Sequence, residues 1–82
     1  MNDLKDTIEL MLSTDHSDRL KAEYYQTKIR FDKLHNMLVK MEAGTLEFEP
    51  TCPIDLFKIQ INAMEKYLYA LEIRAQIEGV KL

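Results

Sequence analysis

The fold is decided by residues 18–43, DRLKAEYYQTKIRFDKLHNMLVKMEA, in which apolar side chains return at alternating spacings of four and three residues. Side chains at these spacings lie on one face of an α-helix, because the helix turns once in about 3.6 residues. The pattern therefore predicts one long helix with a single apolar seam, interrupted only by a threonine. The seam consists of Leu20, Tyr24, Thr27, Phe31, Leu34, Leu38 and Met41.

The residues that follow predict a second helix of the same kind. Gly44 favours an end to the first helix, because glycine readily takes the left-handed conformation there, and residues 44–52 are predicted to form a loop. Pro53 and Asp55 both favour a first helical turn, so a second long helix is predicted over residues 53–80. Its apolar positions repeat the same spacing and predict an antiparallel hairpin. These positions are Phe57, Ile61, Met64, Leu68, Leu71 and Ala75.

The start of the chain is expected to add a short helix and a turn. A helix from about Asn2 to Leu12 gathers apolar side chains on one side, and the polar run STDHSD then interrupts it. Small polar side chains of this kind cap helices, so the long helix is predicted to start near Ser17 or Asp18. The chain is thus expected to be a single all-α domain. Its parts are an N-terminal helix and turn (1–17), a long helix (18–43), a loop (44–52) and a second long helix (53–80).

The second long helix carries an additional apolar strip that a two-helix hairpin leaves uncovered. The short N-terminal helix is too small to cover all of it, and a chain of 82 residues forms only a marginal core on its own. Association with copies of the same chain would bury the strip, so a homo-oligomer is predicted. The strip consists of Ile59, Ala63, Ala70, Ile73, Ile77 and Val80.

Several classes of protein are disfavoured by what the sequence lacks. It has no glycine-rich phosphate loop, nucleophile elbow or His-Glu-x-x-His motif, which argues against an enzyme. Cys52 is the single cysteine, and His16 and His35 are too far apart to form a ligand pair on one helix face, so no metal or cofactor is expected. The chain has no signal-like leader and no run of about 20 apolar residues, which predicts a cytoplasmic protein without membrane contact.

The charge of the chain is unevenly distributed. The formal net charge is −3, which disfavours binding to DNA or RNA polymers. Residues 19–40 nevertheless carry six basic and two acidic side chains. A locally basic helix in an acidic protein suits a small anion better than a long polyanion, which needs an extended basic track. The alternative interpretation is a solvated helix face.

Basic and aromatic side chains line both edges of the seam in this helix. Phosphates are bound by fixed cations and nucleobases stack on aromatic rings, so the two edges are candidates for nucleotide binding. Flanking lysines and arginines are equally typical of any soluble helical hairpin, and Tyr24 on the seam is also a candidate core residue. One edge carries Gln26, Arg30, Lys33, Met37 and Lys40, and the other carries Lys21, Tyr25, Lys28 and His35.

Two runs of residues resemble a known family. The first is Arg19-x3-Glu23-Tyr24-x3-Lys28-x-Arg30-x2-Lys33-Leu34, and the second is Leu56-x3-Gln60-x3-Met64-x2-Tyr67-Leu68-x2-Leu71-x2-Arg74. In this order, around a short loop, they resemble the helical-hairpin family of small phage proteins that includes the anti-CBASS and anti-Thoeris nucleotide sponges. Similar proteins are found in crAss-like phages. The resemblance spans about residues 18–78.

The resemblance implies a phage anti-defence protein without enzymatic activity. Such sponges bind and sequester cyclic nucleotide immune messengers, either cyclic di- and trinucleotides or cyclic ADP-ribose variants, without degrading them. They assemble into homo-oligomers, typically hexamers, and bind their ligands between protomers. This resemblance places the protein in the cytoplasm of an infected bacterial host.

Particular residues acquire expected roles through the same resemblance. Arg19, Lys28 and Arg30 become candidates for holding phosphates, and Tyr24 and Tyr25 become candidates for stacking on a base. Two further candidates are Lys58, from a neighbouring chain, and His16, the only flat side chain where some members of the family place a stacking ring. The alternative hypothesis is a small phage helical protein that binds a host or phage protein through the second apolar strip.

Overall fold

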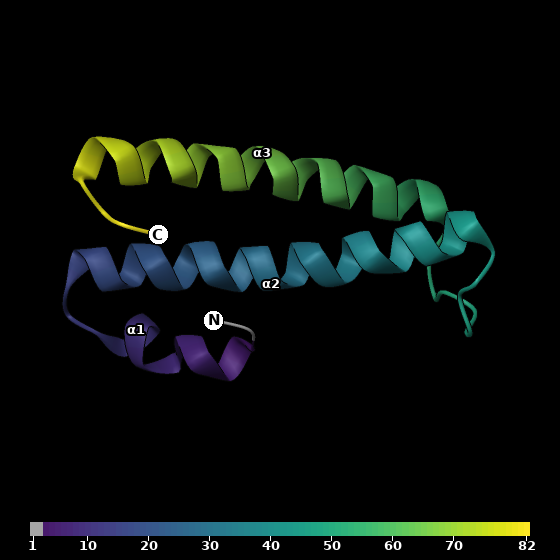
Figure 1. The fold of residues 1–82 in the computed structure, drawn as a ribbon, viewed down its shortest axis with the longest axis horizontal. Helices are drawn as coiled ribbons and strands as arrows, with labels where there is room; N and C mark the ends of the chain where they lie inside the picture. The colour runs from purple at the N-terminus through teal and green to yellow at the C-terminus, as the bar shows by residue number, and fades with distance from the viewer. Residues whose placement is uncertain (1–2) are drawn as a thin grey trace.

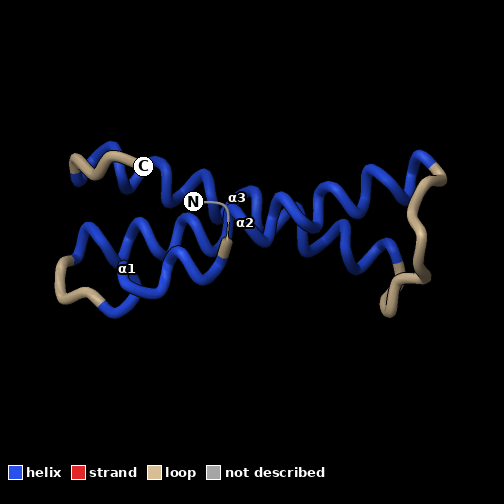
Figure 2. Tube along the Cα trace, turned by 60° about the horizontal axis from the view of Figure 1, so that its bottom comes forward, coloured by secondary structure: helices blue, strands red, loops and turns tan. Residues whose placement is uncertain are grey.

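The computed structural model describes residues 3–82 and is all-α, as predicted. A 3-10 turn, η1 (Leu4–Thr7), leads into the short helix α1 (Ile8–Leu12), and two long helices follow, α2 (His16–Ala43) and α3 (Ile54–Glu78). Figure 1 shows α2 and α3 side by side as an antiparallel hairpin, with α1 on the other side of α2 from α3. Figure 2 shows the hairpin loop at the opposite end of the elongated molecule from the turn between α1 and α2.

Helix α2 begins two residues before the predicted start because Asp15, and not Ser17 or Asp18, is its N-cap. The Asp15 side chain accepts a hydrogen bond from the Ser17 backbone N–H at 2.9 Å. The Ser13 hydroxyl supports this turn, since it accepts from the Asp15 N–H at 3.0 Å and donates to Asp18 at 2.9 Å. The other end agrees with the prediction, because Gly44 takes a left-handed conformation with φ 75°.

Helix α3 ends two residues before the predicted position, and this changes the place of Val80. Gly79 adopts a left-handed conformation with φ 71°, and the Val80 N–H then donates to the Ala75 carbonyl at 2.8 Å. This reversal returns Val80 to the interior, where it joins the core cluster of Leu20, Leu71 and Ala75. Val80 was expected in the uncovered strip of α3, and that expectation is wrong because the helix does not continue that far.

The N-terminal segment is attached to α2 through a buried polar residue. Thr7 is fully buried; its hydroxyl donates to the Leu4 carbonyl at 2.7 Å and accepts from Gln26 Nε2 at 3.1 Å. Both η1 and α1 pack against α2, and in residues 3–82 neither packs against α3. The predicted start of this helix at Asn2 lies outside the described residues.

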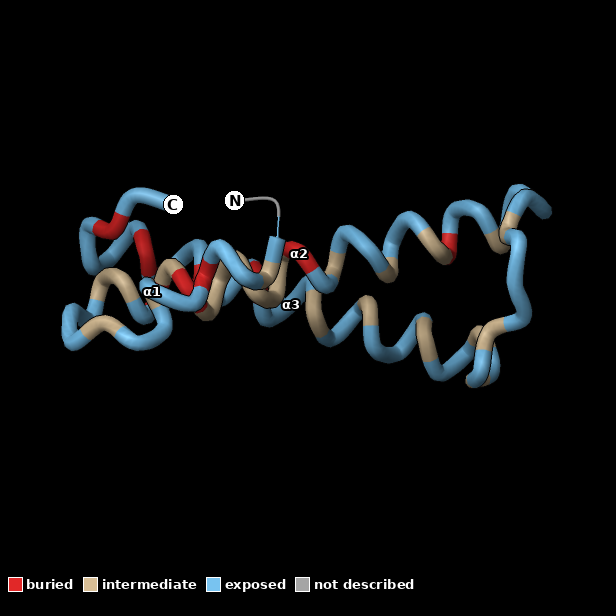
Figure 3. Tube along the Cα trace, turned by 90° about the horizontal axis from the view of Figure 1, so that it is seen from below, coloured by how far each residue is buried: buried red, intermediate tan, exposed pale blue. Residues whose placement is uncertain are grey.

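The core lies mainly where α1, α2 and the last turns of α3 overlap. Figure 3 shows most of the buried positions toward this end, whereas the pair of helices that continues to the loop is more exposed. The predicted seams of α2 and α3 do face the interior, and every member is buried or half-buried. The second strip of α3 remains open, with Ile59 66% and Ile77 80% exposed. In the described residues, none of the helices has the length and apolar character that crossing a membrane requires.

Candidate functional site

A groove of about 630 Å³ lies between α2 and α3 on one side of the hairpin. Helix α2 contributes Tyr24, Lys28 and Phe31, whose spacing of four and three residues places them on one face. Helix α3 contributes Asn62, Glu65, Lys66, Leu68, Tyr69 and Glu72. The groove therefore combines aromatic rings, two lysines and two carboxylates above the buried side chain of Leu68.

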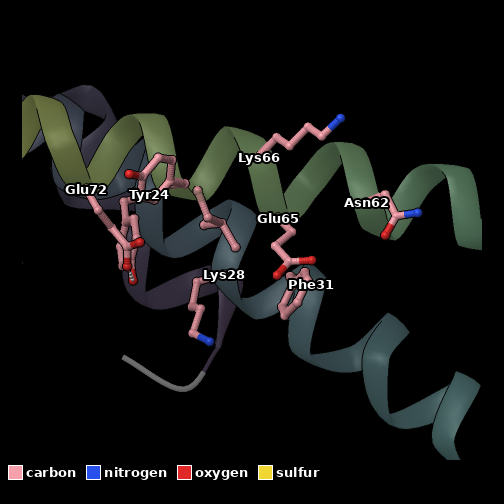
Figure 4. A pocket seen from close by; sticks show the side chains of 9 residues that line it. Tyr24, Lys28, Phe31, Asn62, Glu65, Lys66 and Glu72 are labelled. Carbon is pink, nitrogen blue, oxygen red and sulfur yellow. Dashed lines mark hydrogen bonds between the residues drawn. The ribbon is translucent and has the colours of Figure 1, made fainter.

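Tyr24 links the two walls of the groove. Its hydroxyl donates to Glu72 Oε2 at 3.2 Å, as the dashed line in Figure 4 marks, and its ring packs against the core cluster. Burial raises the pKa of Tyr24 above its usual value, and the negative charge of Glu72 together with this hydrogen bond raises it further. Tyr24 is thus held as a neutral donor with a fixed ring. The Tyr25 ring meets it edge-on, with centroids 5.3 Å apart.

Lys28 lies in the middle of the α2 wall. Its ammonium group is 3.1 Å from Asp32 Oδ1 and 5.4 Å from the centre of the Phe31 ring. Phe31 in turn stacks on His35 at a centroid distance of 6.0 Å. Because the ion pair with Asp32 is largely exposed, it contributes little to stability, and water or a ligand can replace it at small cost.

The structure brings only two of the predicted nucleotide-binding residues into this groove, Tyr24 and Lys28. Tyr25 lies beside Tyr24 but does not line the groove. Arg30 follows Lys28 by two positions, which turns its side chain by about 200° around α2 and places it on the other flank. Arg19 is exposed, and it too lies outside the groove lining.

The remaining two predicted residues lie at the ends of the hairpin. Lys58 is near the loop and forms an ion pair with Glu42 at 3.6 Å. His16 is the first residue of α2 and pairs with Glu78 at the end of α3. Neither lines the groove of its own chain.

Seven groove residues were not singled out as binding candidates in the sequence. Phe31 and Leu68 were assigned to the apolar seams, and Lys66 and four other polar positions of α3 were not considered as binding residues. A usable signal was present, because these polar positions recur at spacings of three and four residues along one face of the helix. They are Asn62, Glu65, Tyr69 and Glu72.

A second set of polar contacts joins α2 and α3 outside the groove lining. Glu23 accepts a hydrogen bond from the Tyr67 hydroxyl and lies 4.0 Å from Arg74 Nη1. Arg74 Nε also donates to Glu78 at 3.3 Å. The hydrogen bond from His16 and the bond from Arg74 hold the pKa of Glu78 below its usual value. These contacts cross-link the N-terminal part of α2 to the C-terminal half of α3.

Metal ligands are not clustered in the part of the chain that the structure describes. No group of three or more His, Cys, Asp or Glu side chains among residues 3–82 is arranged to hold a metal ion. The groove chemistry is that of a binding site, with ring faces for stacking, ammonium groups for anions and carboxylates for hydrogen-bond donors.

These features define a class of small helical-hairpin proteins with a ligand-sized groove between their two long helices. The chain belongs to the Sequestin family, whose family model matches residues 14–77. The match covers α2, the loop and nearly all of α3, and therefore the entire groove. The expected resemblance is confirmed as far as a phage sponge-like family, without its assignment to the anti-CBASS or anti-Thoeris sponges. Membership of this family indicates that the chain sequesters a signalling molecule rather than transforming it. Comparisons with curated proteins and with solved structures gave no match.

Proposed function

We propose that this protein is a phage anti-defence sponge that binds a cyclic nucleotide immune messenger in the cytoplasm of the infected bacterium. The messenger is of the cyclic di- or trinucleotide type or of the cyclic ADP-ribose type, as in the anti-CBASS and anti-Thoeris sponges. The observation that carries the proposal is a groove lined by the aromatic residues Tyr24, Phe31 and Tyr69 together with Lys28, within a sequestering family.

The groove has the size and the chemistry for a nucleotide. Its volume of about 630 Å³ falls inside the range of about 300–1,000 Å³ found for small-molecule sites. A base stacked on an aromatic side chain contributes about 1–3 kcal/mol, and a charge-assisted hydrogen bond contributes about 1.5–3 kcal/mol. Two of each approach the value of about −12 kcal/mol that corresponds to nanomolar binding, provided that the groove is ordered before the ligand arrives.

Copies of the chain are proposed to complete the site. The strip of α3 formed by Ile59, Ala63, Ala70, Ile73 and Ile77 is exposed, and burying it against other copies would add the core that a small domain lacks. A homohexamer is the proposed assembly. His16, Arg19, Arg30 and Lys58 lie away from the groove of their own chain, so their proposed contribution is to the ligand of a neighbouring copy.

Ligand capture without turnover tests this function directly. The purified protein is incubated with a panel of cyclic di- and trinucleotides and cyclic ADP-ribose isomers, and its unfolding temperature is measured. A sponge shows a stabilising shift with at least one compound, and mass spectrometry recovers that compound intact after heat denaturation. Absence of any shift across the panel would contradict the proposal.

A pair of charge reversals tests the place of binding. Lys28→Glu should abolish the thermal shift, because it places a carboxylate where the phosphate is expected. Lys33→Glu is the matched control, since Lys33 is an exposed lysine of the same helix that does not line the groove. Equal binding by the two variants would show that the basic flank is a solvated face.

The exposed strip also favours a second candidate function, a module that binds a host or phage protein. Under this alternative the free protein is a monomer whose strip stays open at micromolar concentration. Sedimentation velocity separates the two functions. A stable symmetric oligomer supports the sponge, and a monomer that associates nonspecifically supports the protein-binding module.

A further inference from the structure

In the groove an aromatic ring of α2 lies beside a glutamate of α3 at two places. Tyr24 and Phe31 are seven residues apart on α2, and Glu65 and Glu72 are seven residues apart on α3. Because the two helices are antiparallel, Tyr24 lies with Glu72 at one end and Phe31 lies beside Glu65 at the other, as Figure 4 shows. Two helical turns separate the two ends, a distance of about 10.5 Å.

Each end joins a flat aromatic ring to a carboxylate. A ring face stacks on a planar heterocycle, and a carboxylate accepts hydrogen bonds from its N–H groups. A carboxylate also repels a phosphate, which disfavours placing phosphates at either end. In residues 3–82 no hydrogen bond or ion pair engages the Glu65 carboxylate, so its oxygens remain open to a ligand.

A cation lies between the two ends. Lys28 follows Tyr24 by one helical turn and precedes Phe31 by nearly one, so its ammonium group is at the middle of the α2 wall. In Figure 4 the Lys66 side chain extends from α3 away from α2, and the Lys28 side chain extends from α2 away from α3. Between its two acceptor ends the groove therefore has one ammonium group on α2, and a phosphate can replace the exposed ion pair of this group with Asp32 at small cost.

We propose that the groove takes a nucleotide with two planar heterocycles held apart on either side of its phosphates. One heterocycle stacks at Tyr24 with Glu72, the other stacks at Phe31 with Glu65, and Lys28 binds a phosphate between them. This inference rests on the proposed function and narrows its ligand, because it excludes messengers that carry a single heterocycle.

Two compounds that share a pyrophosphate and differ in the second base test this inference. Diadenosine diphosphate carries an adenosine on each phosphate, and ADP-ribose carries one adenine. Isothermal titration calorimetry on the full chain should give about tenfold tighter binding of diadenosine diphosphate, because a second stacked base contributes about 1–3 kcal/mol. Equal affinity for the two compounds would overturn the inference.

Variants at the Phe31 end locate the second heterocycle. Phe31→Leu keeps an apolar side chain on the seam and removes the ring, so it should lower the affinity for diadenosine diphosphate toward that for ADP-ribose and reduce the selectivity between the two compounds. Glu65→Gln provides a second readout that does not touch the core, with a loss of about fivefold in the affinity for diadenosine diphosphate. Glu47→Gln is the matched control, because Glu47 is exposed and lies outside the groove.

The outcomes separate this inference from the function on which it rests. Unchanged selectivity in both Phe31→Leu and Glu65→Gln overturns the inference. The inference is also overturned if the protein binds a messenger with one heterocycle but binds neither diadenosine diphosphate nor any cyclic dinucleotide. In that case the proposed sponge function still stands. Failure to bind every nucleotide in the panel contradicts the proposed function itself.

Discussion

The hydroxyl of Tyr24 on α2 donates to Glu72 Oε2 on α3 at 3.2 Å, across the end of the groove. The same two helices are joined in the reverse sense outside the groove lining, where the Tyr67 hydroxyl of α3 donates to Glu23 of α2. Neighbouring residues on α2 thus supply the donor of one bond between the helices and the acceptor of the other. This reciprocal arrangement fixes the rotation of each helix and with it the position of the Tyr24 ring.

Removing the Tyr24 hydroxyl should loosen this connection. Tyr24→Phe is expected to lower the free energy of unfolding by about 0.5–1.5 kcal/mol, the usual contribution of one hydrogen bond, and to weaken ligand binding severalfold because the ring is less well held. Urea denaturation and calorimetry measure the two effects. Tyr69→Phe is the control, since Tyr69 lines the groove but is largely exposed. An equal loss of stability in both variants would count against the role of the Glu72 bond.

The pKa of Glu78 predicts a loss of stability in acid. Contacts with His16 and Arg74 lower this pKa from its ordinary 4.5 in the folded chain, so the folded state favours the carboxylate. The resulting stabilisation is present above pH 4.5 and is lost as the pH falls through the lowered folded pKa. Glu78→Gln removes it. Denaturation curves should therefore differ between the two proteins at pH 6 to 7, by roughly the stabilisation itself, and converge at acid pH. Parallel pH profiles would contradict the assignment.

The two valines of the chain test whether the C-terminal turn belongs to the core. Val80 is 8% exposed in the core cluster, and Val39 is 52% exposed on α2. Val80→Ala should lower the free energy of unfolding by about 2 kcal/mol, because it removes two buried methyl groups and leaves a partial cavity. Val39→Ala should change it by no more than about 0.5 kcal/mol. Thermal or urea unfolding measures both, and equal effects would show that Val80 is not packed as described.

A charge placed on the open strip of α3 tests the proposed assembly. Ile77→Glu and Ile59→Glu should each shift the protein from oligomer to monomer in sedimentation velocity, because a carboxylate is costly to bury between copies. Helicity by circular dichroism should be retained, since both side chains are exposed in the single chain. Leu12→Glu is the control, because Leu12 is also an exposed apolar residue but lies on α1. Dissociation by all three variants would point to a different interface.

The hairpin itself could be predicted from local spacing. Leu20 and Leu71 were both assigned to the facing seams, and they are 2% and 1% exposed. Helix ends were less predictable, because Asp15, Ser17 and Asp18 are all good N-caps and only the hydrogen bond to the Ser17 N–H decides among them. The position of Val80 required knowing that the chain reverses at Gly79.

The candidate site was predicted only in part. Tyr24 and Lys28 were identified on α2, but Glu65 and Glu72 approach them from positions more than thirty residues further along the chain. The spacing of the seams specifies that the two helices pack against each other. It does not specify the axial offset between the helices or which flank of the hairpin stays open. Arg30 and Lys28 are equally basic in the sequence, and only one of them faces the groove.

The sequence by itself determined the number of long helices, their apolar faces and the stop at Gly44, because these depend on the angle per residue and on local backbone preferences. Only the tertiary structure decided that Phe31 meets Glu65 while Tyr24 meets Glu72. Those pairings depend on the rotation and offset of α3 against α2, which are set by the packing of both seams together.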